Sequence, residues 1–231
     1  MASIQPARND HNSFIPLVPK QTMPREILVV KKEALFEGEE FLGFMPVEKK
    51  DFSKNILSNF EYKERTDELE YNFDFQQIIP YIWIINPKTK QVFAYRRAPD
   101  TRYDEARLRD KWSGGIGGHI DKENPIPQDP IELAALRELQ EEVVITGELK
   151  LKLAGFINSD IGSVEKAHFG VAYLVETEDD VKKGDDEMTH GQFYSLEEME
   201  KIFGDPNNQI EAWTQISWPF VKKYLTSLPN Q

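Results

Sequence analysis

The chain has 231 residues, 39% of them hydrophobic and 29% charged, which is enough to bury the core of one large domain or of a domain with an added lobe. Its net charge of −12 argues against a broad nucleic-acid-binding surface, because such binding rests on phosphate neutralisation by Lys and Arg. The sequence contains no cysteine, so disulfides, thiolate metal sites and a cysteine nucleophile are excluded.

The N-terminal third of the chain carries the weaker structural signals. Residues 1–24 are polar with scattered prolines and have no continuous apolar run, so we expect a flexible arm, with neither a signal peptide nor a membrane span, in a cytoplasmic protein. Short apolar runs at 27–30 and 41–44 predict strands. We interpret 25–75 as an N-terminal extension or small lobe, which could dock a partner or form a homodimer.

From residue 76 onward the periodic signals are stronger. A helix is predicted from about Asp129 to Val143, since Asp129 suits an N-cap and Pro130 the first helical position. We assign 76–228 to one domain, whose interleaved strands and helices favour an α+β or α/β fold. Its other predicted elements are a hairpin of strands at 78–85 and 92–95, strands at 149–157 and 169–176, a helix opened by the capping box Ser195–Glu198, and an apolar segment at 210–225 broken by Pro219.

Three carboxylates share one face of the predicted helix. Glu138, Glu141 and Glu142 are three and four positions apart, a spacing that brings side chains together on a helix. Like charges at this spacing repel, and a hard divalent cation with oxygen ligands would offset the repulsion. The alternative is a solvated acidic face. The glycine turn ending at Gly118 favours the metal site, because glycine lets backbone carbonyls approach an ion without interference from a Cβ.

The run Arg137-Glu138-Leu139-Gln140-Glu141-Glu142 resembles the signature of the Nudix hydrolase family, Gly-x5-Glu-x7-Arg-Glu-U-x-Glu-Glu-x-Gly-U, where U is a bulky aliphatic residue. The central block matches without a change, Ile145 stands at the final U and Gly118 matches the leading glycine. Asp129 stands where the signature has glutamate. The resemblance implies an α+β fold, an α/β/α sandwich with a mixed sheet flanked by helices. It also implies a hydrolase that cleaves a phosphoanhydride bond in a nucleoside diphosphate-X or related substrate.

Two departures from the signature concern loop geometry and leave the metal ligands in place. Ten residues separate Gly118 from Asp129 instead of five, so a longer, proline-bearing loop is expected there. Val144 occupies the position of the signature's last glycine, which usually relieves the backbone where the helix ends. The nearest glycine is Gly147, and the helix is therefore expected to run up to one further turn.

The resemblance also implies the metal ligands. Glu138, Glu141 and Glu142 would hold Mg²⁺ or Mn²⁺, assisted by the carbonyl of Gly118. Such ions screen the charge of the phosphates and lower the pKa of a water molecule, which then attacks the substrate. The same carboxylates are the candidate catalytic residues.

Further roles follow from the resemblance for residues around this cluster. Arg137 would pair with Asp129 and orient the helix, which is a structural role. A carboxylate of the cluster, or one from a loop, must accept the proton of the attacking water. Family members often supply the extra acid from the loop before the last strand, where Glu187 is our candidate. The alternative for Glu187 is a solvated loop charge.

Arginines cluster before the glycine turn in a chain otherwise dominated by acids. Arg96, Arg97 and Arg109 are candidate substrate ligands, because a guanidinium binds phosphate with two parallel hydrogen bonds. The alternative is that they pair with neighbouring aspartates and glutamates. His119 is a further candidate contact for a phosphate or a metal, although lone histidines are more often structural. We assign no role to His168.

Two other functions remain open on this scaffold. One is a prenyl-diphosphate isomerase, which this chain faintly resembles where Trp112-Ser113 leads into a glycine–histidine turn. The chemistry of that isomerase relies on a cysteine, and this chain has none. A ligand-sensing or protein-binding module would usually have lost one of the cluster carboxylates, and all three are present. We therefore expect a hydrolase with a small-molecule diphosphate substrate, without broad nucleic-acid or membrane binding.

Overall fold

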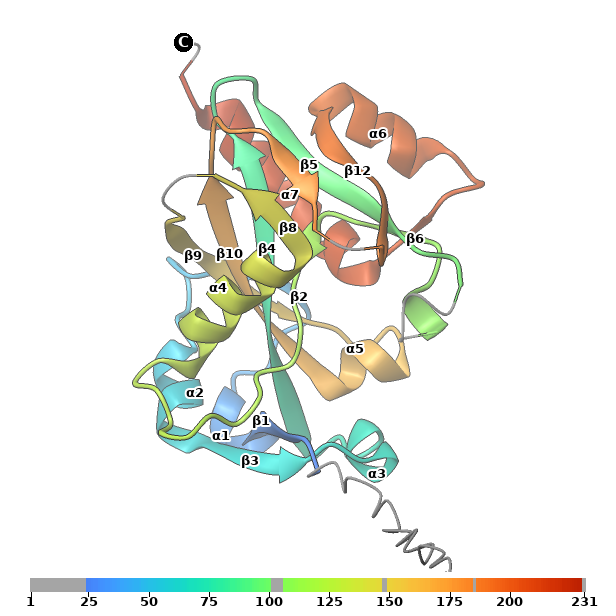
Figure 1. The fold of residues 1–231 in the computed structure, drawn as a ribbon. Coiled ribbons are helices and arrows are strands. Elements are labelled where there is room, and N and C mark those ends of the chain that lie inside the picture. The colour runs from blue at the N-terminus through green and yellow to red at the C-terminus, as the bar shows by residue number, and fades with distance from the viewer. Residues whose placement is uncertain (1–23, 101–105, 147–148, 185, 230–231) are drawn as a thin grey trace, which may run out of the picture.

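The computed structural model describes residues 24–100, 106–146, 149–184 and 186–229 (Figure 1). The predicted arm lies outside these ranges except for its last residue. The strands are β1 Glu26–Lys31, β2 Gly43–Pro46, β3 Phe60–Glu64, β4 Phe75–Asn86, β5 Gln91–Arg97, β6 Lys111–Ser113, β7 Gly115–Ile116, β8 Val143–Ile145, β9 Leu151–Asn158, β10 His168–Glu176, β11 Val181–Lys183, β12 Met188–Ser195 and β13 Gln209–Ile210. The helices are α1 Lys32–Phe36, α2 Ser53–Asn59, α3 Asp67–Glu70, α4 Pro130–Glu142, α5 Ser163–Ala167, α6 Leu196–Gly204 and α7 Ala212–Ser227, with a 3₁₀ turn at Ala106–Leu108.

Strand β4 is the centre of the main sheet. It pairs in parallel with β10 and antiparallel with β1, β5 and β7. The main path through the sheet is β13-β6-β5-β4-β10-β9-β2, so parallel and antiparallel pairs are mixed. β4 is buried along almost all of its 12 residues, as expected for a strand that is covered on both faces.

Alternate residues of β4 point to opposite faces of the sheet and so belong to two cores. Ile78, Ile82 and Ile84 pack with residues of α1, α2 and α4. Tyr81 and Trp83 pack instead with residues of α6 and α7. Helices therefore cover both faces of a mixed sheet (Figure 1), and the predicted α/β/α sandwich is confirmed.

Helix α4 starts and ends within one residue of the prediction. The carboxylate of Asp129 caps it by accepting hydrogen bonds from two N–H groups of the first turn, both at 3.0 Å. The expected extension towards Gly147 is wrong, because the chain enters β8 at Val143 and pairs there with β11. The N–H of Gly184 donates to the carbonyl of Glu142 at 2.8 Å. Strand pairing thus ends the helix without a local glycine.

The C-terminal segment forms one helix, α7, which runs through Pro219. The predicted break is wrong, because tertiary packing holds both halves of the helix. The indole N–H of Trp83 donates to the hydroxyl of Ser217 at 2.9 Å, and Trp218 and Val221 are buried. α7 has 16 residues, and no helix in the described ranges has both the length and the apolarity to cross a membrane.

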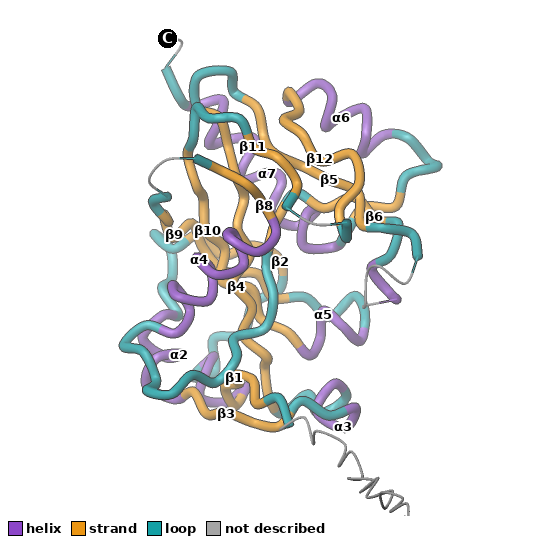
Figure 2. The backbone as a smooth tube through the Cα atoms, viewed as in Figure 1, coloured by secondary structure: helices purple, strands orange, loops and turns teal. Residues whose placement is uncertain are grey.

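Residues 25–75 are built into the main sheet. β1 pairs with β3 and β4, and β2 pairs with β9. The loop after β7 runs along β1 (Figure 2), where the N–H of Leu28 donates to the carbonyl of Ile120 at 2.9 Å and the N–H of Lys122 donates to that of Glu26 at 3.0 Å. The extension therefore reaches the glycine turn and places its own side chains beside it.

Candidate active site

A cavity of about 400 Å³ lies at the glycine turn. Its wall is built from distant parts of the chain. They are the residue before β1, the segment from β3 to α3, helix α4, the junction of α5 with β10 and the start of α7. Most of the predicted site residues line it, although they come from separate parts of the chain. They are Arg97, Gly118, His119, Arg137, Glu138, Glu141, Glu142 and Glu187.

The carboxylates of α4 differ in burial. The side chain of Glu138 is 10% exposed and that of Glu141 is 58% exposed. Gly118 lies directly against Glu138, since a Cβ at position 118 would be 2.6–2.7 Å from the atoms of its carboxyl group. The absence of a side chain at position 118 leaves this space to the carboxyl group of Glu138, so the main chain of the turn and the carboxylate lie on the same side of the cavity. The donor set is made of oxygens, the type that Mg²⁺ and Mn²⁺ prefer.

Burial raises the pKa of Glu138 above its ordinary value, and the nearby charge of Arg137 opposes this only in part. A carboxylate that is costly to ionise in the folded chain destabilises it at neutral pH. Because the pKa of Glu138 is higher in the folded chain than in the unfolded chain, the free energy of unfolding decreases as the pH rises from the unfolded-state value through the folded-state value. The cluster therefore carries an energetic cost that a bound cation would offset.

Replacement of Glu138 by Gln is accordingly expected to raise the melting temperature of the metal-free protein at pH 7, by about 2–4 °C for each 1 kcal/mol relieved. The gain should shrink at pH 4, where the wild-type carboxyl group is protonated. Calorimetry in EDTA at both pH values measures this. A variant that melts below the wild type at pH 7 would contradict it, and Glu132→Gln on the exposed side of the helix is the control.

Arg137 does not pair with Asp129, which corrects the prediction. Its guanidinium donates to the carbonyl of His119 at 2.9 Å and to the carboxylate of Glu138 at 2.7 Å. One of its nitrogens lies 3.9 Å from the carboxylate of Asp121. The physical reason is distance, because Asp129 lies eight residues before Arg137, about 12 Å along the helix axis, and its carboxylate is occupied by the helix N-terminus.

The capping role of Asp129 can be separated from an ionic one by two substitutions. Asparagine caps helices as well as aspartate does, whereas alanine costs about 1 kcal/mol. We therefore expect Asp129→Asn to melt close to the wild type and Asp129→Ala to melt about 2–4 °C lower. Equal destabilisation of the two variants would point back to an ion pair.

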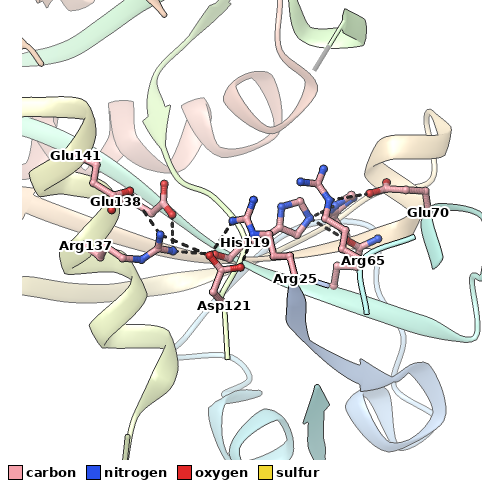
Figure 3. A network of polar contacts seen from close by, with 10 residues as sticks. Arg25, Arg65, Glu70, His119, Asp121, Arg137, Glu138 and Glu141 are labelled. Atoms are coloured by element: carbon pink, nitrogen blue, oxygen red, sulfur yellow. Dashed lines mark hydrogen bonds and ion pairs between the residues drawn. The ribbon is translucent and has the colours of Figure 1, made fainter. Parts of the chain in front are cut away.

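A chain of polar contacts continues from α4 across the cavity (Figure 3). Asp121 accepts two hydrogen bonds from Arg25, at 2.5 and 2.9 Å. Beyond His119, Arg65 lies 3.5 Å from the carboxylate of Glu70. Sequence reasoning missed these four residues, Arg25, Arg65, Glu70 and Asp121, because nothing in their local pattern distinguishes them from other surface charges.

His119 meets a second histidine, His168, which was left without a role. Their Nε2 atoms are 3.2 Å apart, and His119 Nε2 is 2.8 Å from the side-chain oxygen of Gln77. Nδ1 of His168 donates to the carbonyl of Val164 at 2.6 Å. Burial is the main cause that lowers the pKa of both imidazoles, so both are neutral at physiological pH.

The predicted arginines divide into two groups. Arg97 lines the cavity and forms a buried ion pair with Glu211, at 3.3 Å. Arg96 instead donates to the carboxylate of Asp110 at 2.9 Å. This is the alternative stated for the arginines, namely pairing with a neighbouring acidic residue. Among the described residues that line the cavity, neither Arg96 nor Arg109 appears. The cavity wall therefore gives no support to their expected role as substrate ligands.

Residues 76–215 match the family model of the NUDIX domain. The chain is similar to the solved structure of Tm1382, a protein assigned to the Nudix hydrolases, with 29% identity, a TM-score of 0.69 and coverage of 86% of this chain and 99% of that chain. It also shares the fold of DR0079 from Deinococcus radiodurans, with 13% identity, a TM-score of 0.50 and coverage of 79% of this chain and 97% of that chain. No curated protein matches the sequence.

Proposed function

The chain belongs to the Nudix hydrolase family, whose domain model matches more than half of it, and from this membership we propose which reaction is catalysed in the cavity. The chain is a phosphohydrolase that cleaves a phosphoanhydride bond in a nucleoside diphosphate-X or related small molecule, with Mg²⁺ or Mn²⁺ as its cofactor. One observation carries the proposal, namely that Glu138, Glu141 and Glu142 line the same cavity as Gly118.

The residues around this cluster suit a hard divalent cation. The carboxyl group of Glu138 lies against Gly118, and its neighbours on α4 supply further carboxylate oxygens. A cation bound there would screen the phosphates and lower the pKa of a water molecule. Arg137 shares the carboxylates of Glu138 and Glu141, at 2.7 and 3.5 Å, and so acts as a positioning residue for the cluster.

A proton acceptor is needed for the attacking water, and Glu187 is a candidate outside α4. Its side chain lines the cavity, while its carbonyl accepts a hydrogen bond from the N–H of Ala98 at 2.7 Å. That contact ties the main chain of Glu187 to the end of β5. The carboxylates of the α4 cluster are the other acceptors within the cavity.

Cationic and polar groups on the remaining wall would bind the phosphates. Arg97 and His119 are the predicted residues of this kind that line the cavity, and Arg25 and Arg65 from the N-terminal extension add two further guanidinium groups. Arginine matches the geometry of phosphate oxygens and is always charged. The cavity thus has carboxylates for a cation beside arginines for an anion, as a metal-bound diphosphate requires.

A substrate panel tests the proposal. Nucleoside diphosphate-X compounds, dinucleoside polyphosphates and prenyl diphosphates are each incubated with Mg²⁺ or Mn²⁺, and products are followed by phosphorus NMR. Metal-dependent appearance of two phosphate-bearing products supports hydrolysis. Tight binding without turnover would indicate a sensing module, and an isomerised prenyl diphosphate would indicate an isomerase; either result would overturn the proposal.

A further inference from the structure

We propose that Glu70, His119 and His168 form a second cation site in the cavity, selective for a transition metal that prefers nitrogen ligands, such as Zn²⁺. Each residue offers one ligand atom, and these atoms lie within 4.8 Å of one another. The site is separate from the carboxylates of α4, which lie at the other end of the polar chain in Figure 3. Imidazole ligands favour Zn²⁺ and its neighbours, whereas carboxylates alone suit Mg²⁺.

The spacing of the two imidazoles fits a shared ion. Zn–N bonds are about 2.0–2.1 Å long, so two nitrogens on one tetrahedral ion are about 3.3 Å apart. The Nε2 atoms of His119 and His168 are 3.2 Å apart. The two rings therefore already hold their nitrogens at the separation that ligation needs.

Contacts behind the ligands also match those of a metal site. Metal-binding histidines usually donate their second ring N–H to a carbonyl or carboxylate, which fixes the tautomer. Nδ1 of His168 makes this contact with the carbonyl of Val164 at 2.6 Å, so Nε2 carries the lone pair and directs it at Nε2 of His119, its hydrogen-bond partner. His119 would bind the ion as its other tautomer, with the proton moved from Nε2, which now lies 2.8 Å from the side-chain oxygen of Gln77, to Nδ1.

Glu70 supplies the negative charge of the proposed site and is held in place by arginines. Its side chain is 14% exposed, and its two oxygens lie 3.5 Å from Arg65 and 3.7 Å from Arg107. Such partners orient a ligating carboxylate, although their charge also weakens the attraction for a cation. The neutral imidazoles must therefore provide much of the affinity, which again favours Zn²⁺ over Mg²⁺.

Three protein ligands leave a fourth position open. Glu70, His119 and His168 all line the cavity, so the open position would face the same space as the α4 cluster. Sites with three protein ligands and an open position bind water or a ligand there. A substrate group in the cavity could therefore contact the transition metal while its phosphates contact the α4 site.

Cobalt distinguishes the two sites in one titration of the metal-stripped, full-length chain without a histidine tag. Four-coordinate Co²⁺ with nitrogen ligands absorbs visible light strongly, whereas six-coordinate Co²⁺ among oxygens absorbs weakly. We expect strong visible bands that saturate at one equivalent. The Co²⁺ affinity that the bands report should fall by at least about tenfold in Glu70→Gln and His168→Asn, since loss of even an outer-shell partner costs that much. The bands should disappear on addition of Zn²⁺ but not of Mg²⁺.

Matched control variants show whether a loss of the bands comes from the proposed site, from the α4 cluster or from misfolding. Glu141→Gln, in the α4 cluster, and His190→Asn, at an exposed histidine, should both retain the bands. Asn at 168 keeps an N–H donor for Val164, and Glu70→Gln keeps the shape of the side chain; circular dichroism checks both folds. Weak bands in the wild type, bands that persist in Glu70→Gln, or bands lost in Glu141→Gln would overturn the second site, whether or not the protein hydrolyses any diphosphate.

Discussion

Glu141→Gln is expected to lower kcat of the diphosphate hydrolysis by roughly 10³-fold, the order of effect seen when one group that stabilises the transition state is removed. The side chain of Glu141 is more than half exposed in the cavity, so the substitution removes a charge without disturbing the core. Glu142→Gln should behave similarly. Initial rates at saturating substrate, over a range of Mg²⁺ and Mn²⁺ concentrations, give the measurement.

Glu132→Gln is the control for this experiment. It lies on the same helix, is exposed and does not line the cavity, so it changes the net charge by the same amount as Glu141→Gln. Its kcat should stay within about twofold of the wild type, because surface changes away from a site have small effects. Equal loss in both variants would show that the net charge, and not a metal ligand, determines the rate.

Arg97→Met is expected to destabilise the protein by about 3–5 kcal/mol, which corresponds to roughly 6–20 °C in the melting temperature. The side chains of Arg97 and Glu211 are only 6% and 9% exposed. Removal of the arginine leaves the carboxylate buried without its counter-charge, and an uncompensated buried charge costs far more than the ion pair contributes. Thermal and urea unfolding both measure the loss.

Two further variants separate this explanation from a loss of packing. Arg97→Met/Glu211→Leu should recover most of the stability, since a buried ion pair can often be replaced by apolar groups at little cost. Glu211 makes no side-chain cap to α7, so its replacement removes no capping hydrogen bond from the helix. Arg96→Met breaks the exposed pair with Asp110 and should cost no more than about 1 kcal/mol. If the double variant is as unstable as Arg97→Met, the charge argument is wrong.

The N-terminal extension also matters for the site and not only for the fold. Arg25, Arg65 and Glu70 line the cavity although they precede the residues that match the family model. Because β1 pairs with β4 and runs along the loop after β7, the extension completes one side of the cavity. The proposed transition-metal site and two of the arginines proposed to bind phosphate depend on it.

The sequence by itself determined those features that depend on neighbours a few positions away. The start of α4, its cap at Asp129 and the capping box at Ser195 follow from the hydrogen-bonding needs of helix termini. The shared face of Glu138 and Glu141 follows from helical spacing. These predictions succeeded because local geometry leaves few alternatives.

Only the tertiary structure decided which distant groups meet. Arg25 reaches Asp121 across 96 positions, His119 reaches His168 across 49, and Arg97 reaches Glu211 across 114. Each of these contacts depends on strand order and register in the main sheet, which no short pattern encodes. Asp129 was likewise assigned as the partner of Arg137, whereas the structure pairs Arg137 with Glu138 of α4 and brings Asp121 from a distant loop to 3.9 Å. The carboxylates of α4 could thus be predicted from the sequence of that helix, whereas the contacts that build the facing wall of the cavity could not.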